Sequence, residues 1–362
     1  MLWLNLVRPC PAHRRCLLYV HNYHTGPSRG DKVAMSGGVD SSVTAKLLAD
    51  PSNEYDLSAV FMRNWDARDE SGSDDGCEWK KDWEDVQRVC RMLDIPVKMD
   101  TMLARPGTQV IVSLDRVPML RKPLDSTKDQ TYYLSSISEN SLSRALFPLS
   151  QLTKAQVRNL AIEWKLPTAT RDESMGLCFV GERKRFSEFI SQYIVPKPGP
   201  IVDMTTGKKA GVHQGLWNYT IGQGAKMSGM PQRMFVAKKD PRANVIFVVP
   251  GADHPALYVE GIRVRNFHWI WADDEPPEVR PSGLKAHIKY RHCMTDVPCT
   301  VHRWVLCTSL FKFGSLTACR DTYGLHIIFH TPQKGIAPGQ IATIYAEDWC
   351  LGCGVIDEVI RT

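Results

Sequence analysis

Apolar residues between positions 31 and 100 follow two alternating patterns. Short, nearly continuous apolar runs are typical of strands buried in a sheet, whereas apolar residues at helical spacing are typical of helices. The expected strands are KVAM (32–35), LSAVFM (57–62) and IPVKMD (95–100), and the expected helices between them are SSVTAKLLAD (41–50) and DWEDVQRVCRMLD (82–94). This alternation predicts an open parallel sheet that binds ligands at the carboxyl ends of its strands.

The pattern changes twice further along the chain. Residues 129–146 and 152–166 have a helical pattern, and Thr153 is placed to cap the second helix. Residues 195–230 are rich in Pro and Gly and contain only short strand-like pieces. From about residue 257 strand patterns dominate: GIRVRNFHWI (261–270), LKAHIKYRH (284–292), GLHIIFH (324–330), GQIATIYA (339–346) and GCGVIDEVI (352–360). Several short strands at close spacing predict a small β-barrel or sandwich.

The composition is typical of a packed globular protein with two or three domains. The chain has 362 residues, of which 43% are hydrophobic and 23% charged. We expect no membrane insertion, because no run approaches the ~20 apolar residues that a membrane span needs. The eleven cysteines are unevenly spaced, which favours a reducing compartment over a disulfide scaffold.

Residues 1–30 differ from the rest, because they contain four arginines and no acidic residue. A part-apolar, Arg-bearing leader of this kind predicts a mitochondrial presequence. A disordered extension and a wrongly chosen start codon are the alternatives. The leader supplies four of the six net positive charges, so the overall charge says little about nucleic-acid binding.

Local charge is more informative. Residues 183–242 hold eleven Lys and Arg against three acidic residues, with aromatic residues interleaved. Basic groups neutralise phosphates and aromatic faces stack on unpaired bases, so this stretch suits RNA. A solvated basic face over an ordinary core explains the pattern equally well.

The loop between the first expected strand and helix is rich in glycine. Residues 34–45 read AMSGGVDSSVTA, and such a loop before a helix usually binds phosphate. The common nucleotide-binding loop has a Lys directly before its Ser or Thr, and this loop has none. Either the segment is only a tight turn, or it holds the pyrophosphate that leaves when ATP adenylates a substrate.

Several segments resemble one enzyme family. SGGVDSS (36–42) resembles the PP-loop of the N-type ATP pyrophosphatases. Four others resemble the tRNA-specific 2-thiouridylases, above all their mitochondrial members: VFMRNWD (60–66), DSTKDQTYYLSSI (125–137), RDESMGLCFVGERKRFSEFI (171–190) and PGQIATIYAEDWCLGCGVI (338–356). The resemblance runs in order from about residue 33 to 358. It implies an α/β fold with a PP-loop (adenine nucleotide alpha hydrolase-like) parallel-sheet domain, a small central domain and a C-terminal β-barrel.

The resemblance also implies domain limits and a reaction. Residues 31–182 would form the ATP-binding catalytic domain, 183–256 a basic tRNA-binding domain and 257–362 the β-barrel. ATP, with Mg²⁺, would adenylate the 2-oxygen of the wobble uridine of a tRNA, and a cysteine persulfide would deliver sulfur as AMP leaves. The expected partners are tRNA and a persulfide donor fed by a desulfurase, and the expected state is a monomer in the mitochondrial matrix.

Site residues follow from the matched motifs. Cys178 corresponds to the persulfide-carrying cysteine, and Arg171, Arg183 and Lys184 nearby would keep its thiolate ionised. The ATP-binding positions are Ala34, Met35, Ser36, Gly37, Gly38, Val39, Asp40, Ser41 and Met62. The tRNA-contacting positions are Lys128, Asp129, Gln130, Lys289, Tyr290 and Gln340, with Lys289 where Arg is often found. For each of these the alternative is an exposed polar residue or a cap. Cys350 and Cys353, like Cys293 and Cys299, are interpreted as structural thiols, and we expect no metal site.

The chain departs from the family in two places. The TPNPDxxCN segment, which holds the other catalytic cysteine, and the GHYAR segment after it are missing near residues 100–118. Residues 303–322 interrupt the strand pattern with no counterpart in the family. We favour an error in exon joining or an alternative transcript over a divergent protein. Without the other cysteine we expect weak or no sulfur transfer, and the alternatives are a tRNA-binding remnant or another adenylating PP-loop enzyme, such as a tRNA lysidine synthase.

Overall fold

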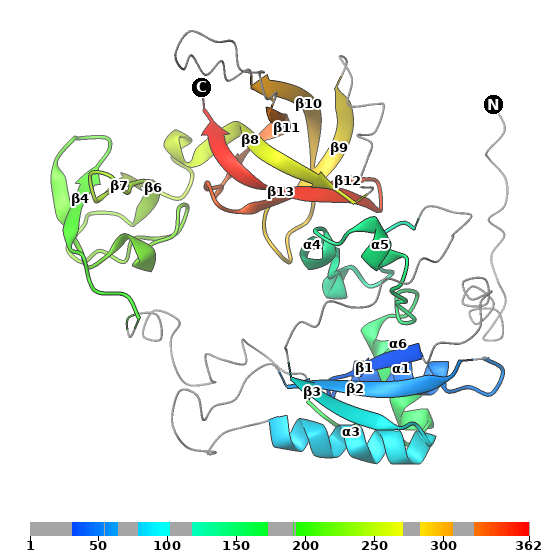
Figure 1. Cartoon of the computed structure of the whole chain (residues 1–362). Coiled ribbons are helices and arrows are strands. Elements are labelled where there is room, and N and C mark those ends of the chain that lie inside the picture. The colour runs from blue at the N-terminus through cyan, green and yellow to red at the C-terminus, as the bar shows by residue number, and fades with distance from the viewer. Residues whose placement is uncertain are drawn as a thin grey trace, which may run out of the picture. The chain divides into compact units, whose positions relative to one another are not determined.

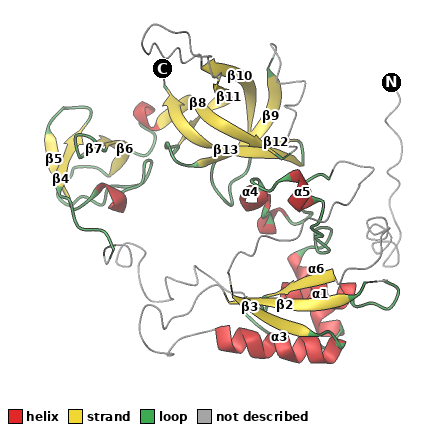
Figure 2. Cartoon of the chain, in the orientation of Figure 1, coloured by secondary structure: helices red, strands yellow, loops and turns green. Residues whose placement is uncertain are grey.

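The computed structural model describes residues 31–53, 55–63, 79–101, 118–172, 191, 193–270, 283–306 and 322–361 (Figure 1). The chain divides into two compact units. The first unit includes residues 31–101, 123–128 and 146–172, and the second includes residues 118–122, 129–145 and the described residues from 191 onward. In the first unit helices pack on a sheet, and the second unit consists mostly of strands (Figure 2).

The first unit contains the expected parallel sheet. Its strands are β1 (Asp31–Met35), β2 (Leu57–Arg63) and β3 (Val97–Thr101), hydrogen-bonded in that order with both pairs parallel. Its helices are α1 (Val39–Leu48), α3 (Trp79–Leu93) and α6 (Lys154–Glu163). The predicted strands and the two predicted helices between them are confirmed, with bounds shifted by a few residues.

One face of this sheet is covered by helices. Val33 and Phe61 are buried against Val86 and Val89 of α3, because apolar residues recur along one side of that helix. On the opposite face Ala34 and Met62 are exposed, and 48% of the Met62 surface is accessible. The alternation of side chains along a strand explains why each strand has one buried and one exposed side.

Of the two helices predicted within residues 129–166, the second is confirmed and the first is not. Thr153 caps α6 as expected: its hydroxyl accepts the Gln156 N–H, and the Gln156 side chain accepts the Thr153 N–H in return. The prediction of one helix at 129–146 is wrong. The segment forms α4 (Thr131–Leu134) and α5 (Glu139–Leu142), because the Ser135 hydroxyl bonds back to the Tyr132 carbonyl and Ser138 caps a new helix.

The second unit includes α4 and α5 and contains a small mixed sheet. Its strands are β4 (Gly199–Asp203), β5 (Lys209–His213), β6 (Met234–Asp240) and β7 (Val245–Pro250), in the order β5-β4-β7-β6. β4 and β7 run parallel, and the other neighbours are antiparallel. Ile201, Val236, Ile246 and Val248 form its core.

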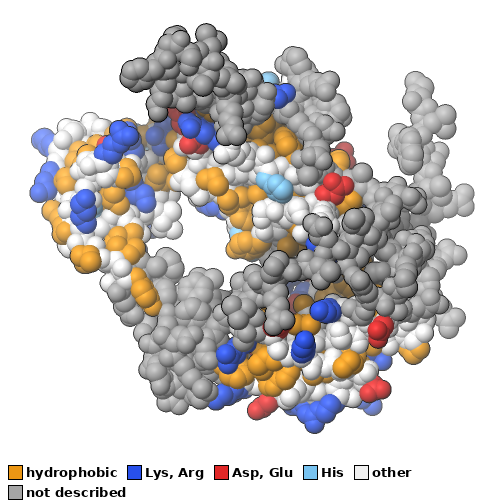
Figure 3. Space-filling view, in the orientation of Figure 1, with side chains coloured by type: hydrophobic (Ala, Val, Ile, Leu, Met, Phe, Trp, Pro, Cys, Tyr) orange, Lys and Arg blue, Asp and Glu red, His pale blue; other side chains and the backbone are white. Residues whose placement is uncertain are grey.

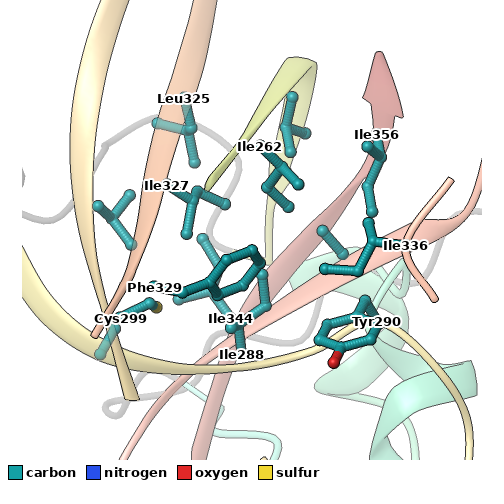
Figure 4. Packing of buried hydrophobic residues seen from close by; sticks show 14 of the residues in the cluster. Ile262, Ile288, Tyr290, Cys299, Leu325, Ile327, Phe329, Ile336, Ile344 and Ile356 are labelled. Carbon is teal, nitrogen blue, oxygen red and sulfur yellow. The ribbon is translucent and has the colours of Figure 1, made fainter. Parts of the chain in front are cut away.

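The rest of the second unit is a closed β-barrel, which settles the choice between barrel and sandwich. Its strands are β8 (Tyr258–Trp269), β9 (Leu284–Lys289), β10 (Val297–Leu306), β11 (Thr322–Lys334), β12 (Ile341–Ala346) and β13 (Trp349–Ile360), closed in the order β10-β11-β8-β13-β12-β9. Ile288, Ile327, Phe329 and Ile344 pack inside it (Figure 4). Closure pairs every strand on both sides and leaves no sheet edge.

The prediction that residues 303–322 interrupt the strand pattern is wrong at both ends of that stretch. Arg303 pairs with Leu325 and Leu306 with Thr322, so these residues continue β10 and β11 as a hairpin. The sequence VPCTVHRWVL hides the strand because Pro298 and Arg303 break its apolar pattern. Residues 307–321 lie outside the described residues. Within the described part of the chain, no helix is long and apolar enough to cross a membrane.

Candidate functional site

The glycine loop joins β1 to α1 at the carboxyl end of the strand. Gly37 has φ +78°, and a Cβ built on it would lie 2.7 Å from the carbonyl oxygen of Asp82. Only glycine combines that backbone conformation with that close approach. The hydroxyls of Ser41 and Ser42 donate to the Gly38 carbonyl at 3.1 and 2.8 Å, which fixes the turn against the helix.

The loop presents the positive end of α1. The first N–H groups of a helix have no partner within it, and the helix dipole adds a partial positive charge. Among the predicted ATP-binding residues, Ser36 and Asp40 are exposed, whereas Met35 and Val39 are buried in the core. Buried members of the set are therefore available to a ligand only through their backbone. Ala34 and Met62 lie on the open face of the sheet.

A lysine reaches the loop from a distant part of the chain. Lys154 Nζ lies 2.6 Å from Asp40 Oδ1, although the two residues are 114 positions apart. Lys154 is the first residue of α6, and its N–H donates to Asp125 Oδ2 at 2.9 Å, which fixes the start of that helix. The loop lacks a lysine in sequence, and the fold supplies one.

Arg171 ties the loop to α3. Its guanidinium donates to the Gly37 carbonyl at 2.9 Å and forms ion pairs with Asp82 and Asp85 of α3. These contacts involve two carboxylates of α3, and the role predicted for Arg171, keeping the Cys178 thiolate ionised, stays a prediction. Cys178, Arg183 and Lys184 lie outside the described residues, and their roles stay predictions.

The predicted tRNA-contacting residues divide by exposure. Lys128, which ends the 3₁₀ turn η2 (Ser126–Lys128), and Gln130 are exposed. Asp129 and Lys289 are each 8% exposed, and Lys289 Nζ lies 2.6 Å from Asp129 Oδ2 in the second unit. Asp129 also accepts the hydroxyl of Thr131 at 2.6 Å. Burial alone would raise the pKa of Asp129, but the hydrogen bonds from Lys289 and Thr131 lower it below its usual value.

This buried pair belongs to a network that holds α4 on the barrel. The hydroxyls of Thr131 and Tyr345 lie 3.1 Å apart, and Lys289 Nζ lies 5.4 Å from the centre of the Tyr345 ring. Tyr290 is 2% exposed, and its hydroxyl donates to Gln333 at 3.0 Å. The half-buried Gln340 accepts the Ala337 N–H at 2.9 Å. Direct contacts of these side chains with tRNA stay predictions. In the structure the Asp129–Lys289 pair joins the start of α4 to the barrel, whereas Tyr290 and Gln340 bond to residues of the barrel itself.

Three cysteines of the barrel are buried and poor nucleophiles, whereas Cys293 in the turn after β9 is exposed. Burial raises the pKa of Cys299 and of Cys350 to about 12, and burial also raises the pKa of Cys353. Thiols with raised pKa values remain protonated near neutral pH, which fits the structural role predicted for them. Among the residues that the structure describes, no group of three or more His, Cys, Asp or Glu is arranged to hold a metal ion.

Basic side chains gather over the β4–β7 sheet. Figure 3 shows several of them on the face in view, and the exposed ones are Lys197, Lys208, Lys209, Lys226, Arg233, Lys238 and Arg242. Lys239 differs: it donates to the carbonyls of Leu216 and Tyr219 at 3.3 and 2.9 Å, and burial lowers its pKa. Most of the basic residues noted in the sequence are therefore available to an anionic partner.

Three family models match the chain in order. The model described as tRNA methyl transferase HUP domain matches residues 32–113 and 107–182, in two segments. The tRNA methyl transferase PRC-barrel domain matches 187–250, and the Aminomethyltransferase beta-barrel domain matches 315–356. The last match begins inside 303–322, so the statement that this whole stretch lacks a family counterpart is wrong.

Named relatives are similar over nearly their whole length. The tRNA-specific 2-thiouridylase MnmA of Shouchella clausii is 34% identical over 379 residues, covering 91% of this chain and 96% of that protein. The mitochondrial tRNA-specific 2-thiouridylase 1 of Gallus gallus is 32% identical over 405 residues, covering 89% and 90%. Both alignments are longer than the 362 residues of this chain, so both relatives hold residues without a counterpart here.

Among solved structures, an NMN synthetase from Francisella tularensis covers 46% of this chain and 73% of its own, with 15% identity and a TM-score of 0.26. That likeness is too weak to bear on the function.

Proposed function

Because this chain belongs to the tRNA-specific 2-thiouridylase family, we propose that it acts on the wobble uridine of mitochondrial tRNAs, using ATP to adenylate the 2-oxygen. The single observation that carries the ATP step is the loop geometry, with Gly37 against α3 and Lys154 beside Asp40. The proposal assigns residues 31–182 to the ATP-binding catalytic domain, 183–256 to the basic tRNA-binding domain and 257–362 to the barrel.

The adenylation step follows from the charges at the loop. Oxygen on a urea-like carbon is a poor leaving group. When it attacks the α-phosphorus of ATP, pyrophosphate leaves and the oxygen, now bonded to AMP, becomes a good leaving group. The N–H groups at the start of α1 and the Lys154 ammonium would hold the departing pyrophosphate and stabilise its charge. Asp40 is the acidic side chain of the loop, and we assign it to the Mg²⁺ that accompanies ATP.

The sulfur step would use Cys178. Its persulfide, charged by a desulfurase-fed donor, attacks carbon 2 of the adenylated uridine, and AMP leaves with the former carbonyl oxygen. The bond between the two sulfur atoms must then be broken by another thiolate, which forms a disulfide with Cys178. The exposed basic side chains over β4–β7 would bind the tRNA backbone.

We propose that this chain lacks the second catalytic thiol because of an internal deletion near residues 100–118. Three observations support it. The family model for the first domain is matched in two segments, 32–113 and 107–182; both relatives carry additional residues; and one face of the β1–β3 sheet is open. Parallel sheets are normally covered on both faces. We therefore expect ATP and tRNA binding with little or no sulfur transfer.

The mitochondrial matrix is the compartment that we propose. The arginine-rich, acid-free first 30 residues and the mitochondrial relative from Gallus gallus support it. We also propose that the chain acts as a monomer.

A tRNA-dependent ATP/pyrophosphate exchange assay tests the ATP step. The chain should catalyse exchange in the presence of tRNA, and Lys154→Met should reduce it by about tenfold or more, because a charge-assisted contact to phosphate is lost. Lys165→Met, at an exposed lysine just after α6, serves as the matched control and should leave exchange at saturating tRNA unchanged. Binding of tRNA without exchange would instead indicate a tRNA-binding remnant, which the open sheet face favours as the second candidate.

A further inference from the structure

An aromatic side chain stands exposed where α4 meets the barrel. Tyr133 has 62% of its surface accessible, although it sits one turn from the buried Asp129–Lys289 pair. The centre of its ring lies 4.4 Å from that of His292, with 43° between the two planes. His292 lies in the turn after β9, so residues far apart in sequence build one small surface, the Tyr133–His292 platform.

The platform is held rigidly. Tyr132 packs edge-on against Tyr133 with ring centres 5.7 Å apart, and its hydroxyl donates to the Ile341 carbonyl of β12 at 3.1 Å. Thr131 is anchored through Asp129 to Lys289 of β9. A ring fixed in this way loses little conformational freedom when a ligand stacks on it. With 62% of its surface accessible, Tyr133 keeps area on which a ligand can stack.

The charge around the platform favours an anion. Arg291 is exposed, and its guanidinium lies 5.3 Å from the centre of the Tyr290 ring. Two acids of the same unit are paired with lysines: Asp129 with Lys289, and Asp296 with Lys122 at 2.9 Å. The exposed amide of Gln130 lies at the start of α4. In an unpaired nucleotide the base stacks on a flat apolar face, the phosphate binds a cation, and the base edge bonds to an amide.

We propose that Tyr133 stacks on an unpaired base of the tRNA anticodon loop, with His292 supporting the ring and Arg291 neutralising an adjoining phosphate. The proposal rests on the proposed function, since it requires that the chain binds tRNA, and it names the surface that receives the single-stranded part. A base-paired helix offers no free base face in its interior, so the platform discriminates loop from stem.

Binding of two RNAs to the full chain tests this proposal. One probe is a fluorescein-labelled anticodon stem-loop, and the other is a fully paired duplex of the same length. Tyr133→Leu removes the aromatic ring and should weaken hairpin binding by about tenfold or more, as loss of one base stack does, while duplex binding is unchanged. Tyr133→Phe keeps the ring and should stay within about twofold of the parent chain.

The salt dependence of RNA binding distinguishes a stacking contact from a charge contact. Tyr133→Leu should leave the slope of log K against log salt unchanged, whereas Lys208→Ala should weaken both RNAs and reduce the slope by roughly one. If the parent chain binds neither RNA, the proposed function itself fails. If the parent chain binds the hairpin and Tyr133→Leu binds it equally well, the platform proposal is overturned and the function stands. Equal losses for Tyr133→Phe and Tyr133→Leu would also overturn it, since the hydroxyl would then make the contact.

Discussion

The two units differ in how completely their sheets are covered. In the first unit one face of β1–β3 is buried under helices, while Ala34 and Met62 lie open on the other. In the second unit every barrel strand pairs on both sides, and inward side chains such as Ile344 are fully buried. A parallel sheet normally has two covered faces, and a closed barrel has no free edge. The unit that carries the glycine loop is therefore the one that departs from the usual arrangement.

The difference explains how one chain can keep some functions and lose another. The loop, Lys154 and Arg171 depend on β1, α1, α3 and α6, which are all present. The barrel and α4 are joined by contacts within the second unit, such as the Asp129–Lys289 pair. Both sets of contacts are made by residues outside positions 100–118. On this account sulfur transfer is lost while the RNA-binding half stays intact.

Restoring the missing segment should have the largest effect. The test inserts the corresponding segment of the Gallus gallus relative between Thr101 and Pro118. The restored chain should show tRNA thiolation raised by at least about a hundredfold, because the relay needs both thiols. Mass spectrometry of nucleosides from the treated tRNA measures the product. The same insertion combined with Cys178→Ala should stay at background. Thiolation that remains at background in the restored chain would contradict the deletion account.

Loss of the buried Asp129–Lys289 pair should cost more stability than a change on the open sheet face. Asp129→Ala leaves the Lys289 ammonium buried without its carboxylate and should lower the free energy of unfolding of the second unit by about 3–5 kcal/mol. Met62→Ala, on the open sheet face, should change stability by less than about 0.5 kcal/mol. Urea denaturation followed by intrinsic fluorescence measures both. Similar losses for the two variants would mean that the sheet face is covered after all.

The same pair predicts a smaller, pH-dependent effect. Because the pKa of Asp129 is lower in the folded chain than its usual value, the pair stabilises the fold above pH ~4, and this stabilisation is lost as the pH falls through the folded pKa. Lys289→Met removes the main hydrogen bond that lowers this pKa. The melting temperature of that variant should therefore fall less steeply with acidification than that of the parent chain, and an equal fall would show that other carboxylates dominate.

Local features were predictable from the sequence, and long-range ones were not. The Thr153–Gln156 capping box spans four residues, so the cap could be recognised directly. Lys154 and Asp40 are 114 positions apart and Asp129 and Lys289 are 160 apart, and nothing local indicates either pairing. β10 escaped notice because Pro298 and Arg303 obscure its alternation, although pairing with β9 and β11 stabilises it as a strand. Tertiary pairing overrides weak local preference in such strands.

The central claim is that this chain retains RNA binding but lacks sulfur transfer, and one measurement tests it most directly. The purified chain is incubated with mitochondrial tRNA, ATP and a persulfide donor, and 2-thiouridine is quantified by mass spectrometry while tRNA binding is measured in the same sample. The account predicts bound tRNA with 2-thiouridine at background. Bound tRNA that becomes thiolated over many turnovers would contradict it.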